Sequence, residues 1–336
     1  MKKVLITGAT GLVGSHLTAE LLSRLQQGDT TYGTPVVVAR SDASWGKLDW
    51  VLLRRGVATR LQQRTTAQLE YLDDCRRLLH DERPQVVFHC AARIELGKTK
   101  NDEQLVMRNV EMVHNLITAA LELPADERPL FLHVSSIAAL GNHPSANGCI
   151  DEQAVMENLS GASAYARGKF LSENEVWRGA AHGLSVAVVN PAVILGAMSP
   201  DSGFWFNGLL HAMRRGAHRF WIEGEMAFVS ADDVARALLA LAETPSAWGK
   251  RYILSAENLT YRRFLSQVAR AAALPAPTIR IPRWMLRLTL PFSPSMAAVI
   301  DSYKRFDGSE IMRAVPFRYT DLTQTLDEME HTIEKI

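Results

Sequence analysis

Short apolar runs alternate along this chain with longer stretches in which apolar residues recur at helical spacing. The short runs are nearly continuous in hydrophobic residues, which is typical of parallel strands that are buried on both faces. The runs that predict strands are residues 3–7, 36–39, 85–90, 130–135, 185–190 and 251–255.

The stretches between these runs have the periodicity of helices. Leu17, Leu21, Leu22 and Leu25 share one face of a helix that follows the first run. Further helices are predicted over residues 104–123, 164–182, 231–243 and 261–273. This alternation predicts an α/β fold with a Rossmann-type, doubly wound parallel sheet. Residues 41–82 have weak periodicity and allow one strand and two short helices.

The composition of the chain changes after Pro191. Aromatic residues become frequent, with clusters at residues 204–206 and 220–221, and the α/β pattern returns over residues 228–255. We therefore predict two units. A dinucleotide-binding domain would comprise residues 1–194 with 228–255, and a smaller C-terminal substrate-binding lobe residues 195–227 with 256–336. The aromatic residues either line an apolar substrate pocket or form the core of that lobe.

A glycine turn follows the first predicted strand. In a strand-turn-helix unit, the first glycine permits the turn, the second lets the backbone approach a diphosphate, and the third lets the helix pack closely on the sheet. The amino end of the helix also favours negative charge. The turn predicts a dinucleotide site formed by Gly8, Thr10, Gly11, Leu12, Val13 and Gly14. The alternative is a glycine-rich loop without a ligand.

Arg40 and Ser41, at the end of the second predicted strand, bear on the choice between NADP and NAD. An acidic side chain at this place accepts hydrogen bonds from the ribose hydroxyls of NAD, whereas an arginine pairs with the 2′-phosphate of NADP. Arg40 and Ser41 favour NADP, although Asp42 is close enough in sequence to take the acidic role. Alternatively, Arg40 is a solvated surface arginine that binds no phosphate.

Tyr165 and Lys169 are four residues apart in a predicted helix, so they share one of its faces. A tyrosine with the ordinary pKa of about 10 transfers protons slowly at neutral pH. A nearby ammonium group stabilises the phenolate and lowers that pKa, which suits proton transfer beside a nicotinamide. Ser135 and Ser136 follow an apolar run, where a hydroxyl either holds a substrate oxygen or satisfies backbone groups at a turn.

Composition excludes several other classes. The 336 residues include 37 basic and 36 acidic ones, and this net charge of +1 gives no bulk attraction to nucleic acid or to an anionic membrane. The three cysteines are far apart and favour a reducing compartment, and no spacing of metal ligands is present. No stretch reaches the roughly 20 apolar residues of a membrane span, so we expect a cytoplasmic protein without a metal. His89 and His133 are expected to be core histidines with satisfied nitrogens.

Several motifs occur in an order that resembles a known superfamily. They are the glycine turn, Phe-His-Cys-Ala-Ala at 88–92, Asn109, Val-Ser-Ser at 134–136, Tyr165 with Lys169, and Asn-Pro at 190–191 followed by Gly196. The series resembles the extended short-chain dehydrogenase/reductases, the NAD-dependent epimerase/dehydratase superfamily, over nearly the whole chain. Tyr-Ala-Arg-Gly-Lys at 165–169 is most similar to the dihydroflavonol-reductase-like branch.

The resemblance implies roles for individual residues. Tyr165 would be the catalytic acid/base, and Lys169 would bind the nicotinamide ribose and tune Tyr165. Ser136, five residues before Gly141, would hold the substrate oxygen. The residues that would line the cofactor cleft are Ala91, Ala92 and Asn109, with the backbone around Pro191 and Val193 at the carboxamide.

The chain departs from the family pattern in one respect, and the resemblance has one further implication. The usual aspartate-bearing strand is not recognisable between residues 58 and 70, which leaves the adenine contacts without a candidate. A homodimer would form through the helix that carries Tyr165.

A carbonyl reductase is the function that these features predict. It would transfer hydride between NADP(H), or NAD(H), and a ketone or aldehyde of a medium-sized, apolar small-molecule substrate. One alternative is a nucleotide-sugar epimerase or dehydratase with tightly bound NAD, against which Arg40 counts. Another is a redox-sensing module that binds cofactor without catalysis, which has no need of Tyr165 and Lys169.

Overall fold

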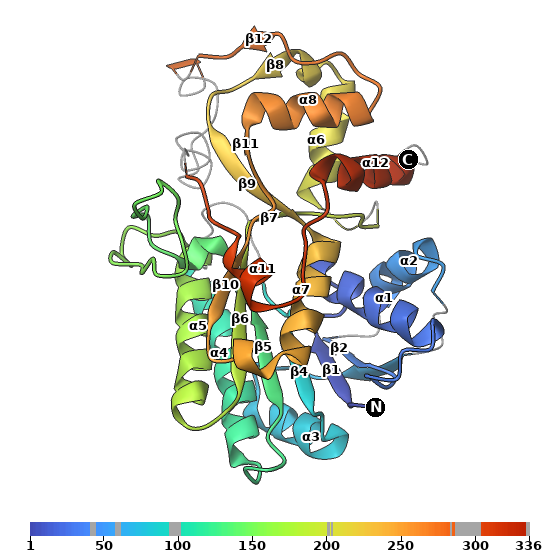
Figure 1. Cartoon of the computed structure of the whole chain (residues 1–336), viewed down its shortest axis with the longest axis vertical. Helices are drawn as coiled ribbons and strands as arrows, with labels where there is room; N and C mark the ends of the chain where they lie inside the picture. Colours follow the sequence, from blue (N-terminus) through green and yellow to red (C-terminus); the bar gives the residue numbers. More distant parts are fainter. Residues whose placement is uncertain are drawn as a thin grey trace.

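Seven parallel strands form the central sheet, in the order β10-β6-β5-β4-β1-β2-β3 (Figure 1). The computed structural model describes residues 1–40, 45–57, 62–93, 102–199, 202, 204–282, 284–285 and 304–333. The strands are β1 (Val4–Thr7), β2 (Val36–Ala39), β3 (Gln63–Thr66), β4 (Val86–His89), β5 (Leu130–Val134), β6 (Val186–Pro191) and β10 (Arg251–Leu254). The six strand predictions are confirmed to within one residue at either end, and the doubly wound α/β fold is confirmed with them.

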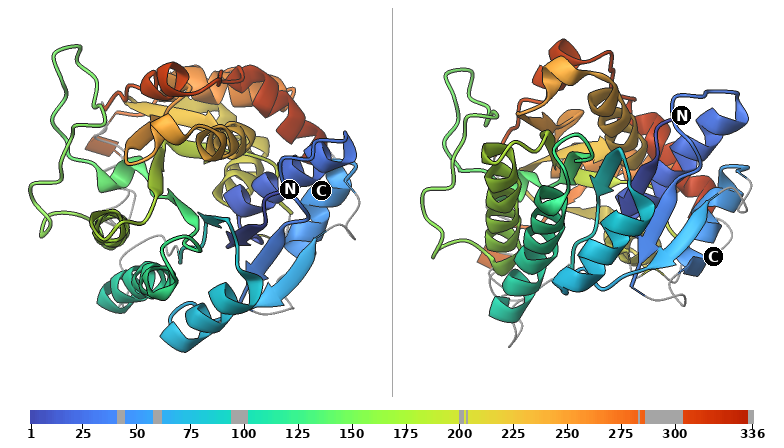
Figure 2. Two further views of the ribbon diagram at one scale, coloured as in Figure 1. Left: turned by 60° about the horizontal axis from the view of Figure 1, so that its bottom comes forward. Right: turned by 90° about the horizontal axis from the view of Figure 1, so that it is seen from below.

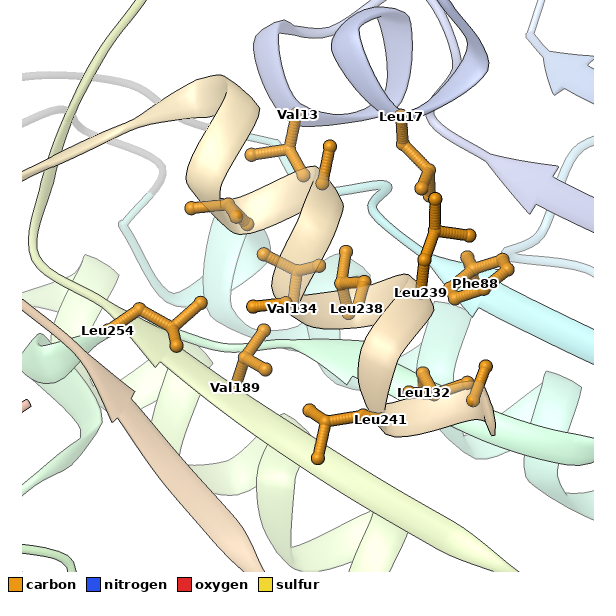
Figure 3. Packing of buried hydrophobic residues seen from close by; sticks show 14 of the residues in the cluster. Val13, Leu17, Phe88, Leu132, Val134, Val189, Leu238, Leu239, Leu241 and Leu254 are labelled. Atoms are coloured by element: carbon orange, nitrogen blue, oxygen red, sulfur yellow. The ribbon is translucent and has the colours of Figure 1, made fainter. Parts of the chain in front are cut away.

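Helices cover both faces of this sheet (Figure 2). The first face carries α1 (Leu12–Gln26), α2 (Trp45–Arg54) and α7 (Ala231–Glu243), and the second carries α3 (Leu72–Glu82), α4 (Asp102–Glu122) and α5 (Ala164–Ala181). Successive residues of a strand point to opposite faces, so Leu132 packs in the first core and Phe131 in the second. Figure 3 shows Leu239 of α7 beside Leu17 of α1 and Phe88 of β4.

The weakly periodic region 41–82 contains one strand and two helices in its described part, as the sequence allowed. Its strand β3 gave no hydrophobic signal because its residues are polar and three of the four are exposed. β3 pairs with β2 alone and forms an edge of the sheet, where no second neighbour buries it.

A smaller lobe stands at the carboxyl ends of the central strands (Figure 1). It contains a three-stranded sheet of β7 (Val193–Leu195), β9 (Glu225–Ser230) and β11 (Glu257–Thr260), and a pair formed by β8 (Phe220–Trp221) and β12 (Ile279–Arg280). Its helices are α6 (Trp205–Arg214), α8 (Tyr261–Ala271) and α12 (Leu322–Ile333), while α11 (Glu310–Ala314) lies beside β10. β9 begins before residue 228 and pairs with β7 and β11 rather than with the central sheet.

The aromatic residues of the smaller lobe divide between its core and its surface. Phe206 is buried with Phe228 and Phe264, and the rings of Phe228 and Phe264 stack at 4.3 Å. Trp205 and Phe220 are exposed. Among the described helices, none combines the length and the apolarity needed to cross a membrane.

Candidate active site

The glycine turn joins β1 to α1 in a conformation that requires glycine at two places. Gly8 has a φ of +67°, and a Cβ atom there would lie 2.6 Å from Cα of Ala91. A Cβ atom on Gly14 would overlap the carbonyl oxygen of Gly8. The N-cap residue of α1 is Gly11, which has no side chain to occupy the amides of the first turn. The turn therefore presents bare backbone at a helix amino end, which suits an anionic group.

Arg40 follows the last residue of β2 and is exposed, while Ser41 lies outside the described residues. Near Arg40, the guanidinium of Arg93 forms an ion pair with Glu70, with Nε of Arg93 3.0 Å from Oε1. Burial would raise the pKa of the Glu70 carboxyl, but the hydrogen bond from Arg93 and the charges of Arg93 and Arg40 hold it below its usual range. Neither Arg93 nor Glu70 was predicted from the sequence as a site residue, although Arg93 follows Ala92 directly.

Asn109 of α4 shapes the loop that follows β4. Its Oδ1 accepts a hydrogen bond from the amide of Arg93 at 2.8 Å, and its Nδ2 donates to the carbonyls of Arg93 and Leu105, both at 3.0 Å. These contacts fix the chain just after Ala91 and Ala92. Asn109 therefore holds the backbone that follows β4 in place.

Ser136 and Tyr165 lie close together beside the end of β5. Ser136 begins a short 3-10 helix, Ile137–Ala139, and its Oγ accepts from the amide of Ala138 at 3.1 Å. Tyr165 lies in the first turn of α5, whose N-cap Ser163 accepts from the amide of Ala166 at 3.2 Å. Burial raises the pKa of the Tyr165 hydroxyl, and a hydrogen bond with Ser136 opposes that rise. The two hydroxyls can thus share a single acceptor oxygen.

Lys169 lies one helical turn after Tyr165 and is buried, with 8% of its surface exposed. Its Nζ donates a hydrogen bond to the carbonyl oxygen of Val134 at 2.8 Å. Burial lowers the pKa of Lys169 from 10.5 to about 8, and this is partly opposed by Cys90 and Glu173. Lys169 is therefore a cation at neutral pH. Because its charge is buried at a cost in free energy, its pKa is sensitive to neighbouring charges.

The remaining predicted residues meet at the same edge of the sheet. Pro191 ends β6, and Val193 begins β7 two residues later. Strands β1, β4, β5 and β6 are sheet neighbours, so their carboxyl ends bring the glycine turn, Ala91, Ser136 and Pro191 to one edge. In open α/β sheets, ligands bind outside this edge.

His89 and His133 are buried, as predicted, but most of their nitrogens are not satisfied. Nδ1 of His89 lies 2.8 Å from Oγ1 of Thr7. Nε2 of His89 and both nitrogens of His133 have no hydrogen-bond partner in the described part of the protein. Their rings stack at 5.4 Å, because the two residues are register partners on β4 and β5. The described residues contain no cluster of side chains that would hold a metal ion.

Comparison with known proteins adds a family match. The model of the family described as "NAD dependent epimerase/dehydratase family" matches residues 4–254. Cinnamoyl-CoA reductase 1 of Petunia hybrida is 29% identical over 270 residues, 77% of this chain and 74% of that protein. Tetraketide alpha-pyrone reductase 1 of Arabidopsis thaliana is 26% identical over 283 residues, 82% of this chain and 83% of that protein.

The fold also matches solved structures. The crystal structure of Gre2 from Candida albicans in complex with NADPH superposes with a TM-score of 0.76. The match covers 100% of this chain and 99% of that one at 17% sequence identity. At this identity the likeness shows the fold alone.

Proposed function

Because the chain belongs to the NAD dependent epimerase/dehydratase family, whose members are NAD(P)-dependent enzymes, we propose that it reduces a ketone or aldehyde to an alcohol with NADPH. The observation that carries this proposal is the placement of Tyr165, Ser136 and Lys169. The hydroxyls of Ser136 and Tyr165 are hydrogen-bonded to each other, and the buried ammonium group of Lys169 lies one helical turn after Tyr165 and bonds to the end of β5, at the edge of the sheet where ligands bind. The reductase names of both relatives support a carbonyl substrate.

The residues of the turn fit a dinucleotide. Gly8 lets the turn approach the backbone of Ala91, Gly14 lets α1 approach the turn, and Gly11 leaves the amino end of α1 without a side-chain cap. Bound there, a nicotinamide cofactor supplies the hydride. The residues that would hold it are Gly8, Thr10, Gly11, Leu12, Val13 and Gly14 at the diphosphate, Arg40 and Ser41 at the 2′-phosphate, Ala91, Ala92 and Asn109 along the cleft, and Lys169, Pro191 and Val193 near the nicotinamide.

The chain's own residues then hold the substrate oxygen and supply its proton. The hydroxyls of Ser136 and Tyr165 donate hydrogen bonds to the carbonyl oxygen and so hold the carbon in position. As negative charge develops on that oxygen, Tyr165 transfers its proton to it. The ammonium of Lys169 stabilises the phenolate that remains. Each role depends on one hydroxyl or one charge, so each can be tested by a single substitution.

We extend the proposal to the substrate and to the division of the chain. The substrate is medium-sized and apolar around its carbonyl, which the name of one relative supports because the cinnamoyl group is an apolar acyl group. Residues 1–194 with 228–255 bind the cofactor, apart from residues 193–194 and 228–230, whose strands β7 and β9 belong to the sheet of the smaller lobe. Residues 195–227 with 256–336 bind the substrate. Two copies of the chain pair through α5.

Calorimetry with NADPH and NADH tests the cofactor part. We expect NADPH to bind more tightly, and Arg40→Ala to weaken NADPH binding by about tenfold or more, since a hydrogen-bonded charge pair is worth roughly 1.5–3 kcal/mol. Arg77→Ala is the matched control, because Arg77 is an exposed arginine of α3 paired with Asp74. Equal binding of both cofactors, or an equal loss of both in Arg40→Ala, contradicts the preference for NADP.

Turnover of a carbonyl panel with NADPH tests the reaction. Tyr165→Phe should remove turnover while NADPH affinity stays within about twofold, because only the proton donor is lost. Full activity of Tyr165→Phe would refute the mechanism. Tightly bound NAD in the purified protein, with no carbonyl reduction, would instead favour the nucleotide-sugar epimerase or dehydratase.

A further inference from the structure

Glu173 is a buried carboxylate with no part in the function proposed above. It lies on α5 one turn after Lys169 and has 2% of its surface exposed. An acidic side chain is rarely buried to this extent unless other groups compensate its charge. The groups that compensate the charge of Glu173 therefore indicate which parts of the protein this charge fixes in place.

Three side chains from different parts of the chain donate to Glu173. Nδ2 of Asn190, on β6, lies 3.0 Å from its Oε2. A guanidinium nitrogen of Arg251, on β10, lies 2.9 Å from Oε1, and the indole nitrogen of Trp177 lies 3.3 Å from the same oxygen. Both carboxylate oxygens are occupied, so Glu173 is fixed at the contact between α5 and the sheet.

One of these donors reaches the proposed catalytic serine. Nδ2 of Asn190 also lies 3.0 Å from the backbone carbonyl oxygen of Ser136. The side-chain amide has two N–H groups, and the structure assigns one to Glu173 and the other to Ser136. A hydrogen bond to a carboxylate is short and strong, so the charge of Glu173 sets the orientation of the amide that holds Ser136.

Glu173 lies four residues after Lys169 on α5, and its charge raises the pKa of Lys169. The other titratable neighbours of Lys169 are uncharged at neutral pH. Burial lowers the pKa of His89 to about 3 and that of His133 well below its usual value, so both rings are neutral. Burial raises the pKa of the Cys90 thiol to about 12, and Tyr165 is a neutral phenol.

Few charged groups therefore lie near Lys169. Arg251 of β10 pairs with Oε1 of Glu173, the carboxylate oxygen that does not contact Asn190. The carboxylates of Glu103 and Glu175 are each paired with an arginine of α5, Arg167 and Arg178 respectively. Among the described residues around Lys169, the nearby negative charge that opposes its loss of a proton is that of Glu173.

We propose that Glu173 is a positioning residue for the reduction: it fixes Ser136 through Asn190, and it supplies the negative charge that holds Lys169 as an ammonium ion. The inference rests on the proposed function, because Ser136 and Lys169 matter through it. A purely structural ion pair that ties β10 to α5 would need Arg251 and Glu173 but would not influence the titration of Lys169. The two roles therefore differ in a measurable way.

An NMR titration of the cofactor-free protein tests the electrostatic part without any substrate. With lysine labelled at Cε, the signal of Lys169 is assigned by its loss in Lys169→Met. In Glu173→Gln, which keeps the size of the side chain, we expect the titration midpoint of Lys169 to fall by about one pH unit or more, since an opposite charge at this range is worth 1–3 units. Glu175→Gln, which changes a half-buried carboxylate of the same helix that pairs with Arg178 and His114, should leave the midpoint unchanged. An unchanged midpoint in Glu173→Gln overturns the electrostatic role.

Kinetics tests the positioning part. At pH 6, where Lys169 stays charged in both proteins, kcat of Glu173→Gln should fall by up to about a hundredfold while KM changes little, because Ser136 is misplaced rather than removed. The decline of kcat with rising pH should also begin at lower pH. The double variant Glu173→Gln/Arg251→Gln removes both charges, and it should regain stability without regaining the wild-type pH profile.

Two controls separate failure of this inference from failure of the proposed function. A wild-type profile in Glu173→Gln, or its full rescue in the double variant, shows that the ion pair is structural and overturns the inference. If Tyr165→Phe retains turnover, the proposed function fails first, whatever Glu173 does. The NMR midpoint is independent of turnover and still decides the electrostatic role.

Discussion

Nδ1 of His16 lies 2.8 Å from Oδ1 of Asp232, and this contact joins the helix of the glycine turn to the first turn of α7. Nε2 of the same ring lies 3.0 Å from the carbonyl oxygen of Ala197. Arg55, just after α2, pairs with the other oxygen of Asp232. Asp232 therefore connects α7 to α1 and to the turn after α2, beside the edge of the sheet that is proposed to bind the cofactor.

Replacing Asp232 by asparagine should destabilise the fold, and more so at neutral than at acid pH. Burial would raise the pKa of Asp232, but the charges and hydrogen bonds of His16 and Arg55 hold it well below the ordinary value of 3.8. A carboxyl whose pKa is lowered by folding stabilises the protein above that ordinary value and loses this contribution as the pH falls toward the folded pKa. We expect Asp232→Asn to lower the free energy of unfolding by about 1–3 kcal/mol at pH 7.

Urea denaturation of wild type and Asp232→Asn at pH 7 and pH 3 measures this effect. The difference between the two proteins should shrink at pH 3, because the wild-type carboxyl begins to bind a proton in the unfolded chain. Asp73→Asn is the control, since Asp73 is 90% exposed in its pair with Arg76 and should contribute less than about 0.5 kcal/mol. A difference that grows toward acid pH would contradict the prediction.

A methyl group at Gly14 should be far more harmful than one at Gly46. Both glycines are helical, but a Cβ atom on Gly14 overlaps the carbonyl oxygen of Gly8 and comes within 2.8 Å of Cα of Ala9. These are backbone atoms, so the turn itself must shift. Gly14→Ala should cost about 1–3 kcal/mol and weaken NADPH binding. Gly46→Ala meets nothing within 4 Å and should stabilise α2 by up to about 1 kcal/mol.

Thermal unfolding and calorimetry with NADPH distinguish the two alanine variants. The comparison is matched because each change adds the same methyl group to an α-helix on the same face of the sheet. If Gly14→Ala keeps both the stability and the NADPH affinity of the wild type, then close packing of α1 on the sheet does not depend on Gly14.

The central sheet was predictable because its signal is local. A strand such as β2, Val36–Ala39, is buried on both faces and its four residues are all apolar. The edge strand β3 lacks this signal because solvent reaches it. The pairs β7–β9 and β9–β11 also gave no clear pattern, since they depend on contacts between segments far apart in sequence.

The same distinction separates the predicted from the unpredicted parts of the site. Tyr165 and Lys169 are four residues apart on one helix, so their spacing alone places them together. Asn190 and Glu173 are 17 residues apart, and Asn190 and Ser136 are 54 apart. No spacing rule connects such residues, and only the order of the strands brings them into contact. The partners of the catalytic groups are therefore a finding of the structure.

The buried charge of Lys169 is expected to lower the free energy of unfolding, although the proposed reaction needs that charge. Burial lowers its pKa from 10.5 to about 8, so between these values the unfolded chain binds a proton that the folded protein does not. The free energy of unfolding of the wild type should therefore rise with pH across this window. Lys169→Met removes the buried charge and loses one hydrogen bond to Val134, worth about 1 kcal/mol. At pH 7 we expect this variant to be at least as stable as the wild type, although its turnover is lost.

Urea denaturation at pH 7 and pH 10, for both proteins, decides this prediction. Other groups titrate over the same range in both proteins, so the difference between them isolates Lys169. At pH 10 the wild type should have gained stability relative to Lys169→Met, because the charge that opposed folding is lost. Lys47→Met, an exposed lysine of α2, should show no such change. A variant clearly less stable than the wild type at pH 7, with a gap that does not widen at pH 10, would mean that the buried ammonium stabilises the fold, and the expected conflict between stability and activity at this position would not exist.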